Sequence, residues 1–347
     1  MSGPENEFHI GKLQFQFLQK LLKHFVSTTE IEDNRVIMGS KLGEDAAVID
    51  MGDKYLVAKT DPITFTSDAI GYYVVNVNVN DVVCTGAIPK WFQSTILLPE
   101  RKTNAELIES IFKDIHNTCK AMNITVIGGH TEISSNLDRP IIVGSLLGEV
   151  EKEKLVLSSG AEPGDDIVLT KGIFIEGTSI IAREKSEFLR KKGYNEDFIN
   201  TCKDYLFNPG IGVYKDALLA NNKFPIKSMH DPTEGGLATG VAEIAIASKT
   251  GIFIDEKHIN ILPEPLELSK IFKLNPLNTI SSGSLLICLE KDYTDELIDS
   301  LKKHNIVAER IGEITPIKEG LKIKNKKNKI EPLNYSETDE ITKIFQF

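Results

Sequence analysis

Three acidic residues, Glu44, Asp45 and Asp61, lie at the two ends of a stretch whose middle alternates between apolar and polar residues. With a turn at Gly52, this pattern predicts a β-hairpin whose open end places Asp45 opposite Thr60. The same register puts Glu44 opposite Asp61. Because facing side chains in such a pair lie only about 5 Å apart, the hairpin collects like charges that repel unless a cation offsets them.

This acidic end has two interpretations that the segment alone leaves open. It is either a solvated loop end or a Mg²⁺ site, because Mg²⁺ takes few protein carboxylates and completes its shell with water and substrate phosphates. Three further segments favour the metal-site interpretation, because each one places acidic residues or glycines next to an apolar run.

The first of these segments ends in Asp81, which follows a run of alternating valine and asparagine from Val75 to Asn80. Alternation suggests a strand. The valines also fit one face of a helix that Gly86 would end, so periodicity does not decide between the two. In the helical case Asn76 and Asn80 lie one turn apart beside Asp81.

The second segment is Gly128-Gly129-His130-Thr131, which follows a short apolar strand at 124–127. Paired glycines let backbone N–H groups approach a phosphate or nucleotide closely, although such a pair more often only forms a turn. His130 is a candidate phosphate donor or general base, without a triad partner visible in the sequence.

The third segment contains Asp231, which with Pro232 and Glu234 has the pattern of a helix start. Gly235 and Gly236 then cost the first turn about 1 kcal/mol each relative to alanine. Glycines at this place are understandable if the backbone contacts an anionic ligand. The chain has neither a P-loop motif nor a Gly-x-Gly-x-x-Gly motif after a strand, which excludes the common nucleotide-binding folds.

The elements that must position these residues mix strands and helices without a strict βαβ rhythm, which favours two α+β domains over a doubly wound sheet. Apolar periodicity predicts helices at 12–25, 103–121, 176–190, 210–222, 231–249 and 292–304. Strands are expected at 46–50, 55–60, 124–127, 139–150, 167–170 and 284–290. A charged run at 151–154 and a turn signal at 162–165 bracket the expected domain junction.

The composition bounds the function. The chain has 347 residues, 41% of them hydrophobic, and a net charge of −10, which excludes a general nucleic-acid or anionic-membrane binder. The lysine-rich run 322–329 is interpreted as a solvated strand and turn. Since no apolar run nears the roughly 18 residues of a membrane span and the N-terminus lacks a signal-peptide pattern, we expect a cytoplasmic protein. The four separated cysteines are expected to be buried structural residues.

Five motifs in this order resemble the aminoimidazole ribonucleotide (AIR) synthetase superfamily, which includes the hydrogenase maturation factor HypE, selenophosphate synthetase and thiamine-monophosphate kinase. The first two motifs are most similar to HypE-like proteins, and the resemblance runs from about residue 11 to about residue 315. The motifs are Gly43-Glu-Asp-Ala-Ala-Val48, Lys59-Thr-Asp-Pro62, Val79-Asn-Asp-Val82 with Thr85-Gly-Ala-Ile-Pro89, Gly128-Gly-His-Thr131, and Asp231-Pro-Thr-Glu-Gly-Gly236.

The resemblance implies an α+β fold of two domains, with an ATP- and Mg²⁺-binding dimerisation domain at 1–155 and a second α+β domain at 156–347. N-terminal strands would form the interface of a homodimer, and residues 75–84 would be a helix. By position, Asp45, Asp81 and Asp231 resemble the metal ligands, and Asp45 and His130 are the catalytic candidates. His130 departs from the Asp that HypE usually has there. The nucleotide contacts would be Thr60, Asp61, Asn80, Gly128, Gly129, Thr131, Gly235 and Gly236.

Two departures limit what the resemblance implies about activity. HypE ends in a Pro-Arg-Ile-Cys-like tail whose cysteine carries the carbamoyl group, whereas this sequence ends Thr342-Lys-Ile-Phe-Gln-Phe347. Residues 1–40 contain no cysteine, which disfavours selenophosphate synthesis. Phe345 and Phe347 are expected to pack against the body of the protein.

We therefore expect a HypE-like enzyme that transfers phosphoryl from ATP to an oxygen of an unidentified small-molecule acceptor, with a maturation-type protein as a candidate partner. One alternative is a small-molecule kinase of the thiamine-monophosphate type. Another is a nucleotide-binding partner protein without turnover.

Overall fold

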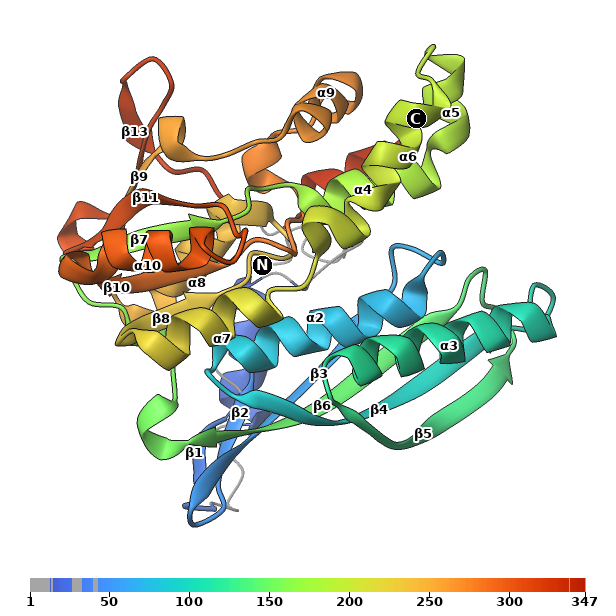
Figure 1. The fold of residues 1–347 in the computed structure, drawn as a ribbon, viewed down its shortest axis with the longest axis horizontal. Helices are drawn as coiled ribbons and strands as arrows, with labels where there is room; N and C mark the ends of the chain where they lie inside the picture. The colour runs from blue at the N-terminus through green and yellow to red at the C-terminus, as the bar shows by residue number, and fades with distance from the viewer. Residues whose placement is uncertain (1–12, 14, 27–32, 40–42, 337, 347) are drawn as a thin grey trace, which may run out of the picture.

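The computed structural model describes residue 13 and residues 15–26, 33–39, 43–336 and 338–346. Helices α2 (Ile70–Cys84) and α3 (Ala105–Ala121) lie side by side over one face of the first of its two sheets (Figure 1). In spatial order, the strands of this sheet are β1 (Val36–Met38), β2 (Ala47–Asp50), β3 (Lys54–Ile63), β6 (Ile141–Glu151), β4 (Ile88–Pro99) and β5 (Thr125–Ser134).

The second sheet and seven further described helices follow in the chain. The strands, in spatial order, are β13 (Ile330–Pro332), β12 (Leu321–Lys324), β9 (Gly251–Asp255), β11 (Ala308–Thr315), β7 (Asp165–Thr170), β10 (Leu286–Glu290) and β8 (Ile226–His230). The helices are α4 (Ile175–Glu184), α5 (Ser186–Lys191), α6 (Glu196–Asp204), α7 (Tyr214–Lys223), α8 (Gly236–Ser248), α9 (Pro263–Phe272) and α10 (Thr294–Lys302). The expected two-domain α+β fold is thus confirmed.

The hairpin β2–β3 has the expected register, with Asp50 opposite Tyr55. β3 continues beyond β2 and pairs with β6 as far as Ile63, so its last residues lie inside the sheet. Since side chains alternate between the faces of a strand, Lys59 and Asp61 lie on the face opposite to that of Thr60.

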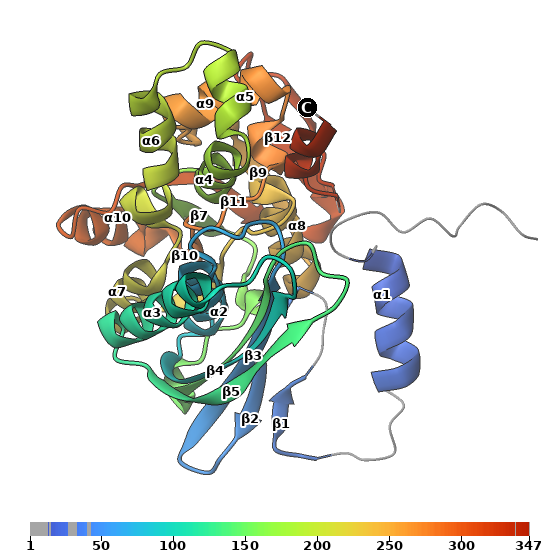
Figure 2. The ribbon, with the colours of Figure 1, turned by 90° about the vertical axis from the view of Figure 1, so that its right-hand side faces the viewer.

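The valine–asparagine repeat forms helix α2, which decides the ambiguity left by its periodicity. Fourteen of its 15 residues are buried, all but Tyr72, because the helix lies between the first sheet and the second domain (Figure 1, Figure 2). A helix enclosed in this way is apolar on several sides, and its polar groups need partners. Asn78 accepts a hydrogen bond from the Asp61 N–H at 3.0 Å. Asn80 accepts one from the Val213 N–H at 2.9 Å and donates one to the Ile211 carbonyl at 2.8 Å.

Two local expectations are wrong. Gly128 and Gly129 do not form a turn but lie within the long edge strand β5, which pairs with β4 on one side. The helix expected from 231 begins only at Gly236, so Asp231 is not its N-cap. Gly235 and Gly236 both have positive φ, which interrupts the predicted first turn.

Most of the remaining expectations are confirmed, but the one for the C-terminal phenylalanines is not. The lysine-rich run is a strand and turn between β12 and β13, as expected, and all four cysteines are buried. At the C-terminus Ile341 and Ile344 are buried, whereas Phe345 is 40% exposed, contrary to expectation, and Phe347 lies outside the described residues. α1 (Phe15–Leu21) forms part of the helix expected at 12–25. Within the described ranges, no helix is long and apolar enough to cross a membrane.

Candidate functional site

A cavity of about 560 Å³ lies between the two domains, and four of the expected site residues line it. Asp45 comes from the loop before β2, Asp61 from β3 and Asp81 from α2, while Asp231 follows β8 in the second domain. The volume is typical of a small-molecule site. The structure therefore brings together carboxylates that are up to 186 residues apart in the sequence, between Asp45 and Asp231.

Close backbone packing holds the loop that carries Asp45. Gly43 has a φ of +82°, and a Cβ placed on it would lie 2.9 Å from the Glu243 carbonyl oxygen on α8. The Glu44 carboxylate accepts hydrogen bonds from the N–H groups of Ser158 and Ser159 in the link between the domains. Both contacts fix the acidic loop against the second domain.

Lys59 is one of two cations that offset the clustered carboxylates. Its Nζ lies 3.3 Å from an oxygen of Asp61 and 3.3 Å from Oδ2 of Asp81. Burial lowers the pKa of Lys59, but attraction to Asp81, Asp61, Asp45 and Asp231 outweighs burial and holds its pKa above the ordinary value. Lys59 is therefore charged at neutral pH.

His230 is the second cation, and it joins the two domains. Nδ1 lies 3.0 Å from Oδ2 of Asp45, and Nε2 lies 2.9 Å from Oε2 of Glu243. Burial lowers the pKa of His230, yet the two carboxylates raise it well above the ordinary value. With an acceptor on each ring nitrogen, the imidazolium form is the one that satisfies both contacts.

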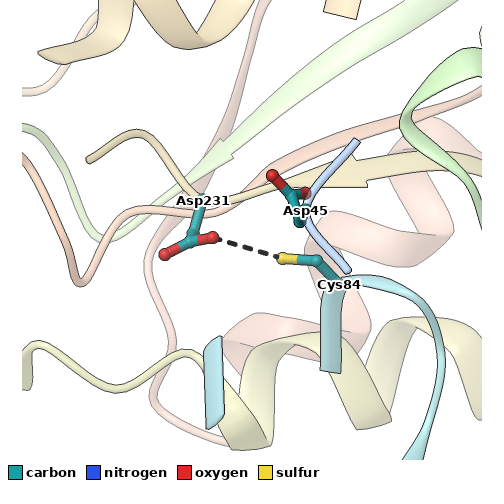
Figure 3. A group of neighbouring side chains, drawn as sticks. All are labelled: Asp45, Cys84 and Asp231. Atoms are coloured by element: carbon teal, nitrogen blue, oxygen red, sulfur yellow. Dashed lines mark hydrogen bonds between the residues drawn. The ribbon is translucent and has the colours of Figure 1, made fainter. Parts of the chain in front are cut away.

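Asp45, Cys84 and Asp231 lie next to one another, with candidate ligand atoms that all lie within 4.8 Å (Figure 3). Cys84 donates from Sγ to Asp231 Oδ1 at 3.8 Å. Burial and the neighbouring carboxylates raise the pKa of Cys84, so it stays a thiol. A thiol is a poor ligand for a hard cation such as Mg²⁺, so Cys84 is not a candidate Mg²⁺ ligand, and its hydrogen bond holds the Asp231 carboxylate.

The donor set fits Mg²⁺. Among the described residues, Oδ2 of Asp231 and Oδ2 of Asp81 are fully buried without a hydrogen-bond partner, although Asp81 keeps its ion pair with Lys59. Burial is the largest cause of the raised pKa of both Asp81 and Asp231. Buried carboxylate oxygens without partners are costly unless a cation satisfies them, and oxygen ligands are those that Mg²⁺ takes.

Several expected site residues do not line this cavity. Thr60 faces the other side of β3, where its hydroxyl donates to the Gly144 carbonyl at 2.7 Å. Asn80 is buried, and both its amide oxygen and its amide nitrogen bond to the second domain, so its side chain serves the contact between domains. His130 is exposed on β5 and pairs with Glu132 at 3.1 Å, away from Asp45.

The exposed strand β5 also carries the remaining nucleotide candidates of that motif. Gly128, Gly129 and Thr131 are exposed and absent from the cavity wall. A Cβ on Gly129 would lie 2.2 Å from the Ser94 carbonyl oxygen, so this glycine allows close pairing with β4.

Gly235 and Gly236 lie next to the cavity but direct their N–H groups to protein acceptors. Gly235 donates to Oδ2 of Asp339 at 2.6 Å, and Gly236 donates to the Thr233 carbonyl at 3.0 Å. The two N–H groups thus bond to Asp339 and Thr233, so the expected contact with an anionic ligand is not prepared in this structure.

Sequence reasoning missed Lys59, His230 and Glu176, which all line the cavity. Lys59 had a signal, because it lies two residues before Asp61 and so on the same face of the strand. His230 directly precedes Asp231 but had no visible partner until the fold brought Asp45 to it. Glu176 begins a helix and had no signal for a site.

Comparison with known proteins identifies relatives across both domains. The models of the AIR synthase related protein N-terminal and C-terminal domains match residues 43–150 and 162–324. A putative hydrogenase expression/formation protein of Methanocaldococcus jannaschii is 29% identical over 313 residues, which cover 88% of this chain and 89% of that protein.

Solved structures share the fold at lower identity. One from a HypE–HypF complex has a TM-score of 0.73 at 21% identity and covers 93% of this chain and 100% of its own. The structure of AaThiL complexed with AMPPCP and TMP has a TM-score of 0.69 at 20% identity, and the match covers 90% of this chain and 95% of AaThiL.

Asp231→Asn should stabilise the metal-free protein at pH 8 and have less effect at pH 5. The pKa of Asp231 is raised in the folded state, so stability falls as rising pH ionises the buried carboxyl, and the amide removes this loss. One pKa unit corresponds to about 1.4 kcal/mol, so we expect a gain above about 1 kcal/mol at pH 8. Melting temperatures at both pH values, with and without Mg²⁺, measure this. Mg²⁺ should raise the wild-type value only, and a variant that Mg²⁺ stabilises equally would contradict the ligand assignment.

Gly236→Ala should destabilise the protein by more than about 1 kcal/mol, although helix propensity alone favours alanine. Gly236 has a φ of +64°, and a Cβ would lie 2.6 Å from the Thr279 carbonyl oxygen. Gly193→Ala is the matched control, because Gly193 has a φ of +93° with no atom within 4 Å of its added Cβ. Urea unfolding should give a larger loss for Gly236→Ala, and equal losses would show that the carbonyl contact relaxes freely.

Proposed function

Because the chain belongs to the AIR synthase-related family, we propose that it is an ATP- and Mg²⁺-dependent enzyme that transfers phosphoryl from ATP to an oxygen of a small-molecule acceptor. One observation carries the proposal. Two fully buried carboxylate oxygens without hydrogen-bond partners, on Asp81 and Asp231, line the same interdomain cavity as Lys59. This combination suits a cation bound together with phosphate groups.

The residues of the cavity would have different roles in this reaction. Asp45, Asp81 and Asp231 would hold Mg²⁺, which when bound neutralises charge on the phosphate oxygens. Lys59 offsets part of the negative charge of the carboxylate cluster and offers a positive charge to an incoming phosphate. His230 holds Asp45 in place through its Nδ1 contact. In phosphoryl transfer the protein mainly positions the reactants and neutralises charge, and these side chains do both.

Structural relatives support a nucleotide as ligand, because the similar AaThiL structure contains AMPPCP. A HypE–HypF complex among the neighbours supports a maturation-type protein as a candidate partner. The reaction itself and its acceptor are our proposal.

A homodimer through β5 belongs to the same proposal. Val126, Ile127 and Ile133 are 47%, 51% and 59% exposed on this edge strand, and exposed apolar edges are normally covered. Gly128–Thr131 do not line the cavity of their own chain, so a contact between them and the nucleotide would have to form in a second copy. Sedimentation should give twice the chain mass of 38.5 kDa, and a monomer at micromolar concentration would contradict the proposal.

Two alternatives remain distinguishable from this function. A kinase of the thiamine-monophosphate type would release ADP only with a phosphorylated acceptor. A nucleotide-binding partner protein would bind MgATP and release no ADP with any acceptor.

Calorimetry with MgATP tests the proposed site. Asp231→Asn should weaken MgATP binding at least tenfold, because it removes a metal ligand, whereas Asp53→Asn should leave it unchanged. Asp53 is an exposed carboxylate in the hairpin turn and does not line the cavity, so it controls for a general loss of negative charge. Unchanged affinity in Asp231→Asn would refute the metal site, and no MgATP binding by the wild type would refute the function.

A further inference from the structure

The interdomain cavity has a second polar region that the nucleotide and metal do not account for. Glu176 lies in the first turn of α4 and is 5% exposed, and Ser282 is 1% exposed. Both line the cavity. Within the described part of the chain, Oε2 of Glu176 and Oγ of Ser282 are fully buried without a hydrogen-bond partner.

Backbone contacts hold these two groups in place. The Phe174 N–H at the start of α4 donates to Oγ of Ser281 at 2.8 Å. The Gly177 N–H donates to the Ile280 carbonyl at 3.2 Å. The start of α4 is therefore fixed against the segment that carries Ser282. The positions of Oε2 of Glu176 and Oγ of Ser282 are thus set by packed backbone.

The surroundings of Glu176 differ from those of the carboxylate cluster around Lys59. The charges with the largest effect on Glu176 are Asp339 and Glu234, whereas Asp231 is affected most by Asp45, His230 and Lys59. Burial raises the pKa of Glu176 to about 7, and hydrogen bonding of its carboxyl group with the side chain and backbone of Ser282 offsets part of that effect. The carboxyl group thus lacks a strong cationic partner.

The wall of the cavity also restricts what can bind beside Glu176. Eight of the described lining residues are Asp or Glu, and Lys59 is the one Lys or Arg among them. Lys59 is already paired with Asp61 and Asp81. The side chains of Ile180 and Ile280 add apolar surface near Glu176. A second phosphate, besides those of the nucleotide, would find no unpaired lysine or arginine here.

We propose that Glu176 and Ser282 form the acceptor subsite, and that they select a phosphate-free compound with N–H or O–H donors, such as an amide, an amine or an alcohol. The inference rests on the proposed function and deepens it, because it assigns the class of acceptor. Oε2 of Glu176 and Oγ of Ser282, the two fully buried atoms without a geometric hydrogen bond, would gain one from such a donor. A phosphate ester in the same place would bring negative charge beside a carboxylate. This assignment excludes an acceptor of the thiamine-monophosphate type.

Matched pairs of compounds test the subsite in the full chain saturated with Mg·AMPPCP. The pairs are ethanolamine and phosphoethanolamine, serine and phosphoserine, and thiamine and thiamine monophosphate, with acetamide as a further phosphate-free probe. Melting temperature and calorimetry should show at least tenfold tighter binding of one or more phosphate-free probes than of its phosphorylated partner. Equal or tighter binding of the phosphorylated partners, or binding of none of the probes, overturns the proposal.

Variants then assign the selectivity to these side chains. Glu176→Gln should weaken the preferred probe at least tenfold and reduce its preference over the phosphorylated partner, while Mg·AMPPCP affinity stays unchanged. Ser282→Ala, a smaller change, should weaken the same probe. Glu187→Gln is the control, because Glu187 is exposed on the following helix α5 and lies outside the cavity. Unchanged probe binding in Glu176→Gln overturns the subsite alone, whereas a wild type that binds no Mg·AMPPCP overturns both this inference and the proposed function.

Discussion

The contact between His230 and Asp45 is the constraint on which the arrangement of the two domains depends. The side chains of His230 and Asp45 are 5% and 12% exposed, and a charge largely removed from water without a partner is strongly destabilising. Asp45 belongs to the first domain and His230 to the second, so neither domain can bury its own group without the other. Because each charge needs its partner, this ion pair favours one relative orientation of the domains. Glu243 forms the second hydrogen bond to the histidine ring, at Nε2.

Helix α2 supports this ion pair through uncharged contacts with both domains. It packs against β3 and β6 on one side and α7 on the other, and its asparagines bond to each side. Asn78 fixes the backbone of Asp61, and Asn80 fixes the segment 211–213. The same helix presents Asp81 and Cys84 to the cavity region, so one element sets the positions of groups that belong to both domains.

The sequence predicted those parts that depend on local pattern. The hairpin register follows from the spacing of Asp50 and Tyr55 around a turn, and it correctly brought Asp45 and Asp61 to the same end. What could not be predicted depends on tertiary contacts. The alternation in α2 is compatible with a strand until both of its sides are known to be covered. Gly236 has the position of a helix start, but it has a positive φ, and the carbonyl groups of Thr279 and Leu277, far away in sequence, leave no room for a Cβ there.

The anchoring of α2 to both domains has a consequence for how the cavity meets its ligands. Asn78 holds α2 to β3 within the first domain, and Asn80 bonds to Ile211 and Val213 of the second domain. Rotating the second domain would therefore break two buried hydrogen bonds of Asn80. Recognition in such a site resembles lock and key more than induced fit. Because domain rotation would cost these two hydrogen bonds, discrimination between ligands would rest mainly on the groups that already line the walls.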